Sequence, residues 1–249
     1  MTLSDILHTL PSAALAFSGG ADSAYLLWAL TQEGVPTAAY FVRTVFQPQF
    51  ELDDAKRLAG ELGAALKILD VDILAEQKIT ENTVERCYFC KKRLFSAILD
   101  AAAEDGYTVL LDGTNASDDA GDRPGMRAIR ELQVRSPLRE AELTKDEIRR
   151  LSREAGLFTW DKPAYACLAT RIPTGTPIRA ERLAVTEQAE AALAALGFRD
   201  FRVRDMGGAA RLQICSEQLP LLLEKRRQVT EIMKEGYSAA TLDLVMRDE

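Results

Sequence analysis

The chain of 249 residues contains a single histidine, His8, and aromatic side chains make up only 7% of it. One histidine close to the N-terminus argues against a Ser–His–Asp relay. No apolar run approaches the roughly 18 residues that a membrane-spanning helix needs. The first ten residues are typical of a short amphipathic helix and not of a signal peptide. We therefore expect a cytoplasmic protein with no membrane partner.

Positive charge is also scarce. Lys and Arg together number 31 against 38 Asp and Glu, which gives a formal net charge of −7. Proteins that neutralise nucleic-acid phosphates usually carry an excess of the opposite sign. The balance argues against a nucleic-acid partner, although a local basic patch is compatible with it. Hydrophobic residues make up 47% of the chain, enough for a buried core. The length favours one large domain or two unequal ones.

Four cysteines are present, and in the cytosol thiols stay reduced. We therefore interpret them as ligands or nucleophiles. Cys87 and Cys90 lie three residues apart and share a face if a helix begins there. Together with Cys167 they would suit an iron–sulfur cluster with one open iron, or zinc with Cys215 as the fourth ligand. Structural or redox thiols are the alternative, and Cys215 is typical of a buried strand residue.

Strand and helix patterns alternate through the first two-thirds of the chain. This order predicts an α/β fold with a mostly parallel sheet covered by helices on both faces. The capping box of Thr144 and Glu147 and the stop at Gly156 predict a helix over residues 145–155. The other predicted strands cover residues 13–17, 37–42, 66–71 and 109–112, and the helices 21–30, 49–62 and 87–103.

The pattern changes after an irregular segment, residues 159–178, which contains three prolines. Beyond it the Gly207-Gly208 pair predicts a hairpin turn between two strands. We expect two domains, residues 1–170 and a small α+β domain over residues 171–249. The elements predicted for the second are helices 180–196 and 217–235 and strands 201–204, 210–214 and 241–245.

The clearest motif is the string Ser18-Gly19-Gly20-Ala21-Asp22-Ser23 between a buried strand and an amphipathic helix. Two glycines allow a sharp turn and a close approach of ligand to backbone. The start of the following helix presents unpaired N–H groups to an anion. Two serine hydroxyls add donors, and a Mg²⁺ ion would bridge Asp22 to phosphates. The string is neither a Walker A loop nor a dinucleotide loop.

This string resembles the signature of the PP-loop ATP-pyrophosphatase superfamily. The resemblance implies a five-stranded parallel sheet of the adenine nucleotide alpha-hydrolase type and ATP as cofactor. It also implies release of pyrophosphate, with transfer of AMP to a substrate. Gly113, in the string that ends the fourth strand, would let nucleotide lie close to the backbone.

A closer resemblance is to the LarE-type sulfur transferases, and it runs over nearly the whole chain. That family adenylates pyridinium-3,5-biscarboxylic acid mononucleotide and converts its carboxylates to thiocarboxylates for the nickel-pincer nucleotide cofactor. The matching strings are residues 121–125, 135–138, 161–176 and 201–204.

The resemblance implies two alternative sulfur sources. In one form of the family the cysteine that matches Cys167 gives up its own sulfur and becomes dehydroalanine. In the other form three cysteines hold a [4Fe-4S] cluster with a transferable sulfide. The presence of Cys87 and Cys90 favours the cluster form here, with zinc as the alternative metal. We also expect a homo-oligomer and a sulfide donor as partner.

The predicted substrate site lies in the C-terminal region. Arg202 and Arg204 alternate on one strand and so share a face, with Arg211 on the partner strand. Such a cluster suits a phosphate or carboxylate, and the resemblance assigns Arg202 and Arg204 to the substrate phosphate. It also matches Glu190 to an acidic site residue, and Arg171 would steady the adenylate. The glycine-rich, arginine-containing tail typical of the family is missing, and Arg247 is a weak substitute.

Two alternatives stay open at this point. The first is another PP-loop enzyme, either an amide-forming synthetase or a tRNA thiolase. The second is a nucleotide-binding regulatory module with a structural zinc, which would bind ATP without releasing pyrophosphate.

Overall fold

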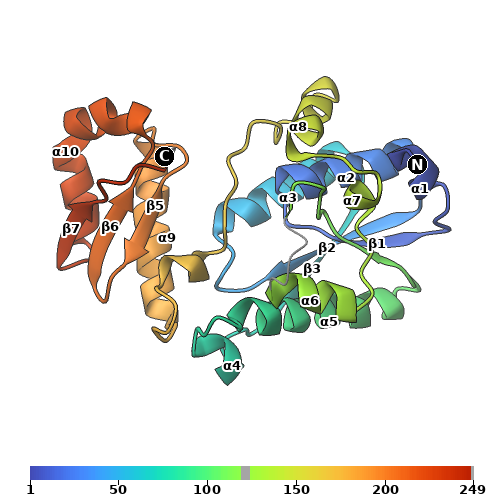
Figure 1. Ribbon diagram of the computed structural model, residues 1–249, viewed down its shortest axis with the longest axis horizontal. Coiled ribbons are helices and arrows are strands. Elements are labelled where there is room, and N and C mark those ends of the chain that lie inside the picture. Colours follow the sequence, from blue (N-terminus) through green and yellow to red (C-terminus); the bar gives the residue numbers. More distant parts are fainter. Residues whose placement is uncertain (119–123, 248–249) are drawn as a thin grey trace. The chain divides into compact units, whose positions relative to one another are not determined.

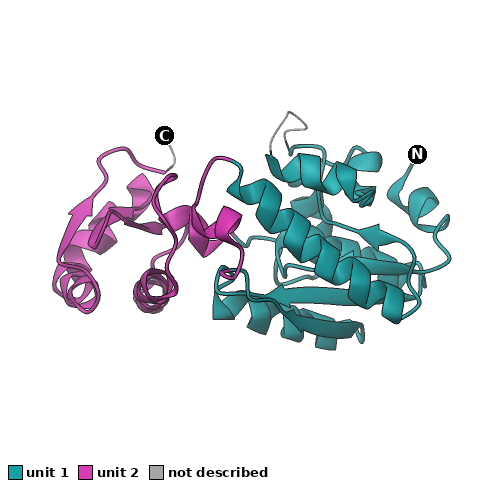
Figure 2. Ribbon diagram, turned by 90° about the horizontal axis from the view of Figure 1, so that it is seen from below, with its two compact units in different colours: residues 1–73, 85–162 teal, residues 74–84, 163–249 magenta. Residues whose placement is uncertain are grey.

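The computed structural model describes residues 1–118 and 124–247. These residues form two compact units, one of residues 1–73 and 85–162, the other of residues 74–84 and 163–249 (Figure 2). We describe each by itself. The expected division into domains after residue 170 stays a prediction, because a compact unit is not by itself an independently folding domain.

The first unit contains a parallel sheet of strand order β3-β2-β1-β4. Alternating residues of each strand face opposite sides of the sheet, so a buried strand contributes side chains to two hydrophobic cores. Arg135 adds a single parallel bridge to Leu111, so the described residues form four strands and one bridge where the resemblance implied five strands. The strands are β1 (Ala13–Ala16), β2 (Thr37–Arg43), β3 (Ala65–Asp70) and β4 (Leu110–Leu111).

Helices cover both faces of this sheet, as the alternating pattern predicted (Figure 1). One core joins Leu15 and Phe41 of the strands to Leu27 of α2 (Ala21–Gln32) and Leu58 of α3 (Gln49–Glu61). The same core takes in residues of α1 (Leu3–Leu7), α7 (Pro137–Glu140) and α8 (Lys145–Glu154). The other core joins the opposite face to α5 (Arg86–Glu104) and α6 (Pro124–Glu131). The α/β fold is confirmed.

The second unit is a small α+β assembly. Its sheet has strand order β5-β6-β7, with β5 antiparallel and β7 parallel to β6. One hydrophobic core joins this sheet to its two long helices. The elements are η1 (Leu168–Arg171), α9 (Ala180–Ala195), β5 (Arg202–Asp205), β6 (Ala209–Gln213), η2 (Ser216–Gln218), α10 (Leu219–Lys234) and β7 (Ala239–Leu242).

A short excursion of the chain, residues 74–84 with α4 (Gln77–Thr80), also belongs to the second unit. Asn82 is fully buried, and its side chain donates to the carbonyls of Pro173 and Thr176 at 2.9 Å. These bonds tie the excursion to the segment that follows η1. Of the helices formed by the described residues, none combines the length and apolar character needed to cross a membrane.

Candidate functional site

The loop between β1 and α2 requires glycine at its third residue, Gly19. Gly19 has a φ of +70°, in the left-handed region that L side chains rarely adopt. A Cβ at this residue would also lie 3.0 Å from the carbonyl oxygen of Glu51 in α3. The left-handed turn and the close approach of α3 therefore both exclude a larger residue.

The two serines of this loop hold it in shape. Ser23 Oγ donates to the carbonyl of Gly20 at 3.2 Å and lies 3.1 Å from Ser18 Oγ. Ser18 Oγ accepts from the N–H of Gly20 at 3.4 Å. Gly20 is the N-cap of α2 and has no side chain to accept from the first turn. The hydroxyls and the start of α2 together form a ready anion site.

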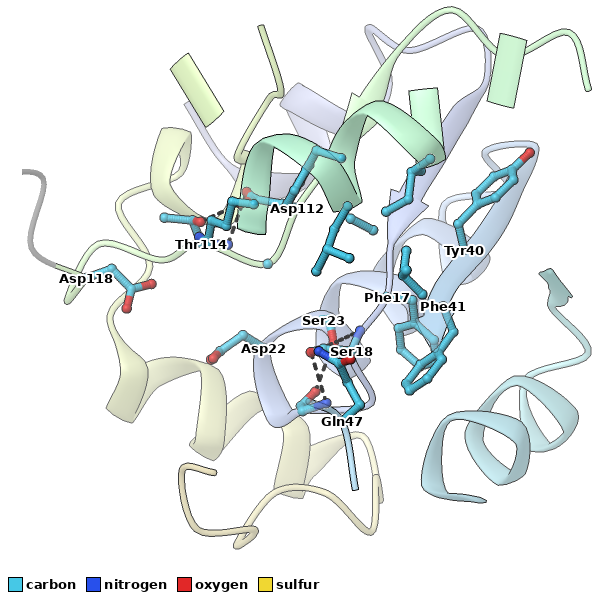
Figure 3. A pocket seen from close by; sticks show the side chains of 18 residues that line it. Phe17, Ser18, Asp22, Ser23, Tyr40, Phe41, Gln47, Asp112, Thr114 and Asp118 are labelled. Carbon is cyan, nitrogen blue, oxygen red and sulfur yellow. Dashed lines mark hydrogen bonds between the residues drawn. The ribbon is translucent and has the colours of Figure 1, made fainter. Parts of the chain in front are cut away.

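The loop borders a pocket of about 300 Å³, within the range of small-molecule sites. Its apolar wall comes from β1, β2 and α5, and its polar wall from the loop and from residues 112–118. Figure 3 shows Ser18, Asp22 and Ser23 of the loop together with Asp112 and Thr114. This unit thus brings together Ser18, Gly19, Gly20, Asp22, Ser23 and Gly113, the predicted ATP-binding residues.

Gly113 lines the pocket and also allows a close backbone contact. A Cβ at this residue would lie 2.9 Å from the backbone nitrogen of Ser23 and 3.1 Å from its Cα. The missing side chain therefore makes room for the start of α2, and the predicted approach of nucleotide to Gly113 stays a prediction. Next to it, buried Asp112 accepts from Thr114 Oγ1 and from Ser136 Oγ, each at 2.6 Å. These contacts fix the end of β4 against the phosphate loop.

The two carboxylate oxygens of Asp22 have different surroundings. Its Oδ2 accepts from Lys145 Nζ at 2.5 Å. Its Oδ1 is buried and has no hydrogen-bond partner among the described residues. A buried carboxylate oxygen without a partner is costly, and hard cations prefer such oxygens. The residues present at this site fit a Mg²⁺ ion.

Two lysines near the loop were missed by the sequence analysis. Lys145 is the first residue of α8, held there by the predicted capping box of Thr144 and Glu147, which is confirmed. Lys162 donates to the carbonyl of Gly19 at 3.2 Å and to Asp54 at 2.6 Å. Neither contact follows a local spacing, since 123 residues separate Lys145 from Asp22. No sequence signal could have indicated these contacts.

The Cys-X-X-Cys pair lies in the first turn of α5. Cys87 is exposed and Cys90 is half-buried, and Arg86 Nη2 lies 3.7 Å from Cys87 Sγ. A helix start and a neighbouring guanidinium both favour a thiolate. The soft thiol donors and their shared face fit a cluster or zinc. The third predicted ligand, Cys167, belongs to the other unit.

Within residues 1–118 and 124–247, no group of three or more His, Cys, Asp or Glu side chains is placed to hold a metal ion. Cys215, expected in a strand, is buried but lies just after β6, where its Sγ donates to the carbonyl of Asp200. The predicted motif residues Gly121, Asp122 and Arg123 lie outside the described part of the chain.

A buried ion pair supports the segment that carries Cys167. Arg171 is fully buried, and its Nε and Nη2 donate to the two oxygens of Glu190 at 2.7 and 3.0 Å. Glu190 also accepts from Tyr165 at 2.7 Å and from the N–H of Val203 at 2.8 Å. Burial opposes the charged guanidinium, but hydrogen bonding to Glu190 raises the pKa of Arg171 above its ordinary value. Tyr165 and Arg171 flank Cys167 in the chain, and Glu190 of α9 binds both of them as well as the backbone of β5. These bonds hold the segment of residues 165–171, here called the Cys167 segment.

Arg202 and Arg204 lie on one face of β5, and both donate hydrogen bonds to backbone carbonyls around Cys167. Arg202 donates to the carbonyl of Ala164, and Arg204 to that of Thr170 at 2.5 Å. Burial, with smaller effects from Arg171 and Arg247, lowers the pKa of Arg202 to about 10. Burial likewise lowers the pKa of Arg204. Closely spaced, poorly hydrated cations of this kind favour an anionic ligand.

Arg211 completes this arginine group. It is the direct cross-strand partner of Arg204, and its Nε lies 3.5 Å from Asp243. Arg247, from the chain end, donates to the carboxylate of Asp200 at 2.7 Å. The second unit therefore contains the predicted substrate-site residues Arg171, Glu190, Arg202, Arg204 and Arg211 together with Cys167, and their roles stay predictions.

Comparison with known proteins gives full-length relatives. No family model matches the chain. Pyridinium-3,5-bisthiocarboxylic acid mononucleotide synthase of Lactiplantibacillus plantarum is 34% identical over 98% of this chain and 89% of its own. An uncharacterised protein of Synechocystis, slr1717, is 35% identical over 94% of this chain and 89% of its own.

A more distant relative covers only part of the sequence. The tRNA-specific 2-thiouridylase MnmA of Pseudothermotoga lettingae is 27% identical over 59% of this chain and 53% of its own. The names of the Lactiplantibacillus and Pseudothermotoga proteins both describe enzymes that make sulfur-containing products, one a pyridinium mononucleotide and the other a thiolated tRNA. The parallel sheet and its phosphate loop agree with sulfurtransferases of the PP-loop class. The chain therefore belongs to the LarE-type sulfurtransferases of the PP-loop superfamily.

Proposed function

We propose that this protein inserts sulfur into pyridinium-3,5-biscarboxylic acid mononucleotide in the biosynthesis of the nickel-pincer nucleotide. The activity for which the Lactiplantibacillus relative is named, aligned over 98% of the chain, supports this substrate. The observation that carries the proposal is the loop from Ser18 to Ser23 beside a pocket of about 300 Å³. An anion-binding turn without a Walker lysine suits release of pyrophosphate.

The first step is formation of an acyl-adenylate. A carboxylate oxygen of the substrate attacks the α-phosphorus of ATP, and the bond to the β-phosphate breaks as pyrophosphate leaves. N–H groups of α2 and the hydroxyls of Ser18 and Ser23 bind the departing pyrophosphate. Asp22 would hold Mg²⁺, which neutralises phosphate charge; its buried, unsatisfied Oδ1 supports this role. Preorganised donors of this kind stabilise charge that develops in the transition state.

The second step replaces AMP by sulfur. Cys87, Cys90 and Cys167 would hold a [4Fe-4S] cluster, which supplies a transferable sulfide at its open iron. In the sacrificial alternative, the thiolate of Cys167 attacks the acyl carbon, AMP leaves, and elimination from the resulting thioester leaves dehydroalanine. Zinc on the same cysteines would favour the sacrificial route, because zinc carries no sulfide to transfer.

The arginine group of the second unit would bind the substrate. Arg202, Arg204 and Arg211 are cations of a kind that suits its phosphate and carboxylates. In this proposal Arg171 and Glu190 act on the reaction by positioning the Cys167 segment. The proposal also includes two domains divided after residue 170, a cytoplasmic homo-oligomer and a separate sulfide donor.

One experiment tests the proposed function. The protein is purified anaerobically, analysed for iron, sulfide and zinc, and incubated with ATP labelled at the α-phosphate and the dicarboxylate mononucleotide. We expect AMP, pyrophosphate and a thiocarboxylate product in equal amounts. ADP in place of AMP would overturn the function. Stoichiometric zinc without iron would exclude the cluster, and the intact mass after turnover would reveal loss of sulfur from Cys167.

A further inference from the structure

Helix α5 links the cysteine pair to the nucleotide pocket through one of its faces. Lys91, Leu94, Phe95 and Ile98 of this helix line the pocket, at the spacing of residues that share a face. Cys87 precedes Lys91 by four residues and so lies on the same face, one turn closer to the helix start. The side chain between the pocket and the thiols is therefore that of Lys91.

Lys91 is a cationic residue in a pocket lining whose other members are apolar, uncharged polar or acidic. Among the described residues that line the pocket it is the only lysine or arginine. No carboxylate in the described part of the chain forms an ion pair with it. The acidic lining residues have other partners, since Asp22 binds Lys145 and Asp112 binds Thr114 and Ser136. The ammonium group is therefore available to an anionic ligand in the pocket.

The neighbouring helix makes room for this lysine. A Cβ at Gly125 of α6 would lie 3.1 Å from Lys91 Cδ and 3.3 Å from its Cε. The aliphatic stem of Lys91 thus packs directly over a glycine, which limits its freedom. A packed stem places the charge with less entropy to lose than an exposed lysine would have.

The anion that meets Lys91 can be identified from the layout of the pocket. The serines lie in the phosphate loop and at the start of α2, and Lys91 comes from a different element, α5. If the loop receives the pyrophosphate half of ATP, as in the proposed function, the remaining phosphate is the α-phosphate. This phosphate must also lie on the side from which sulfur arrives, because the acyl group is attached to it.

We propose that Lys91 binds a non-bridging oxygen of the α-phosphate and stabilises the charge that develops there in both steps. This inference rests on the proposed function. In adenylation, the bond from carboxylate oxygen to phosphorus forms and pyrophosphate leaves with the electron pair of the broken bond. In sulfur transfer, the carbon–sulfur bond forms and AMP leaves with the electron pair. The ammonium group keeps its protons throughout.

The test compares Lys91→Met with the adjacent Lys92→Met. Lys92 is exposed, donates to Tyr88 and Glu131 at 3.1 and 3.2 Å, and does not line the pocket. The single-turnover rate of AMP formation and the dissociation constant for ATP are measured separately for each variant. Unchanged thermal unfolding shows that each variant is folded.

We expect Lys91→Met to lower the single-turnover rate about a hundredfold, with a much smaller change in ATP affinity. Lys91→Arg keeps the charge and should recover part of this rate, and Lys92→Met should behave as the wild type. A Lys91→Met rate within twofold of wild type overturns the inference, as does a loss confined to ATP affinity. Failure of the proposed function is distinguishable, because the wild type itself would then form no AMP.

Discussion

Lys145 Nζ lies 2.5 Å from Asp22 Oδ2, although 123 residues separate the two in the chain. The contact joins the start of α8 to the start of α2 and holds the carboxylate at the edge of the nucleotide pocket. One oxygen is bound to the lysine, and the other is buried without a hydrogen-bond partner among the described residues. The carboxylate thus takes its orientation from a residue that no local pattern connects to it.

This pair should act as a unit in catalysis. Asp22→Asn and Lys145→Met should each slow AMP formation, and the double variant should be hardly worse than Asp22→Asn alone. We expect a coupling of about 1 to 3 kcal/mol in a double-mutant cycle, because the two groups share one contact. The measurement is the steady-state rate of pyrophosphate release. Additive effects would show that the lysine acts independently of Asp22.

Gly113→Ala should destabilise the first unit. The new Cβ would meet the Ser23 backbone at 2.9 Å, and backbone yields poorly, so we expect a loss of about 1 to 3 kcal/mol. ATP affinity should fall as well, because the start of α2 must shift. Gly60→Ala is the matched control, since its Cβ meets nothing within 4 Å. Urea unfolding with and without ATP measures both effects, and equal stabilities for the two variants would contradict the packing role of Gly113.

Glu190→Gln should be severely destabilising. It leaves the buried charge of Arg171 without its carboxylate, at a cost of about 3 to 5 kcal/mol. Glu61→Gln, which removes an exposed ion pair with Arg57, should cost less than about 0.5 kcal/mol. Adding Arg171→Met to Glu190→Gln should recover part of the loss. Denaturant unfolding measures the free energy of unfolding of each variant. A Glu190→Gln variant as stable as Glu61→Gln would contradict the role of Glu190 in stabilising the Cys167 segment.

Inorganic phosphate should stabilise the second unit through its arginines. Burial lowers the pKa of Arg202 to about 10, so its charged form is disfavoured in the folded chain. This cost is present below the folded-state pKa and is relieved as pH rises through it towards the unfolded value. A bound anion offsets the cost at neutral pH, so Tm should rise with phosphate concentration. Arg204→Met should weaken this rise, whereas exposed Arg227→Met should not.

Several parts of the fold could be predicted because their signals are local. The capping box at Thr144 and Glu147 is in place, and α2, α3 and α5 begin within a residue of their predicted positions. Short elements were missed, among them α6 and α7. An element of one or two turns is too short to show a hydrophobic period, and its position depends on the neighbours that cover it.

In the candidate site, too, local features could be predicted from the sequence, whereas contacts between distant residues could not. A string of six residues predicted an anion-binding turn, because a glycine bend before a helix start is a local property of the chain. The close contact of Gly113 with the backbone of Ser23 could not be predicted, because the two residues are far apart in the chain. The residues around Lys91, Lys145 and Lys162 in the sequence do not indicate the contacts that these lysines make.

The sequence by itself determined the order of the strands and the long helices, the phosphate loop and the grouping of the arginines on β5. These follow from neighbouring residues, whose backbone conformation and side-chain direction depend on a few torsion angles. Only the tertiary structure decided that Glu190 is bound to Arg171 and that Asp22 is held by Lys145. Long side chains choose partners by distance and burial after the chain has folded, and a linear pattern contains neither quantity.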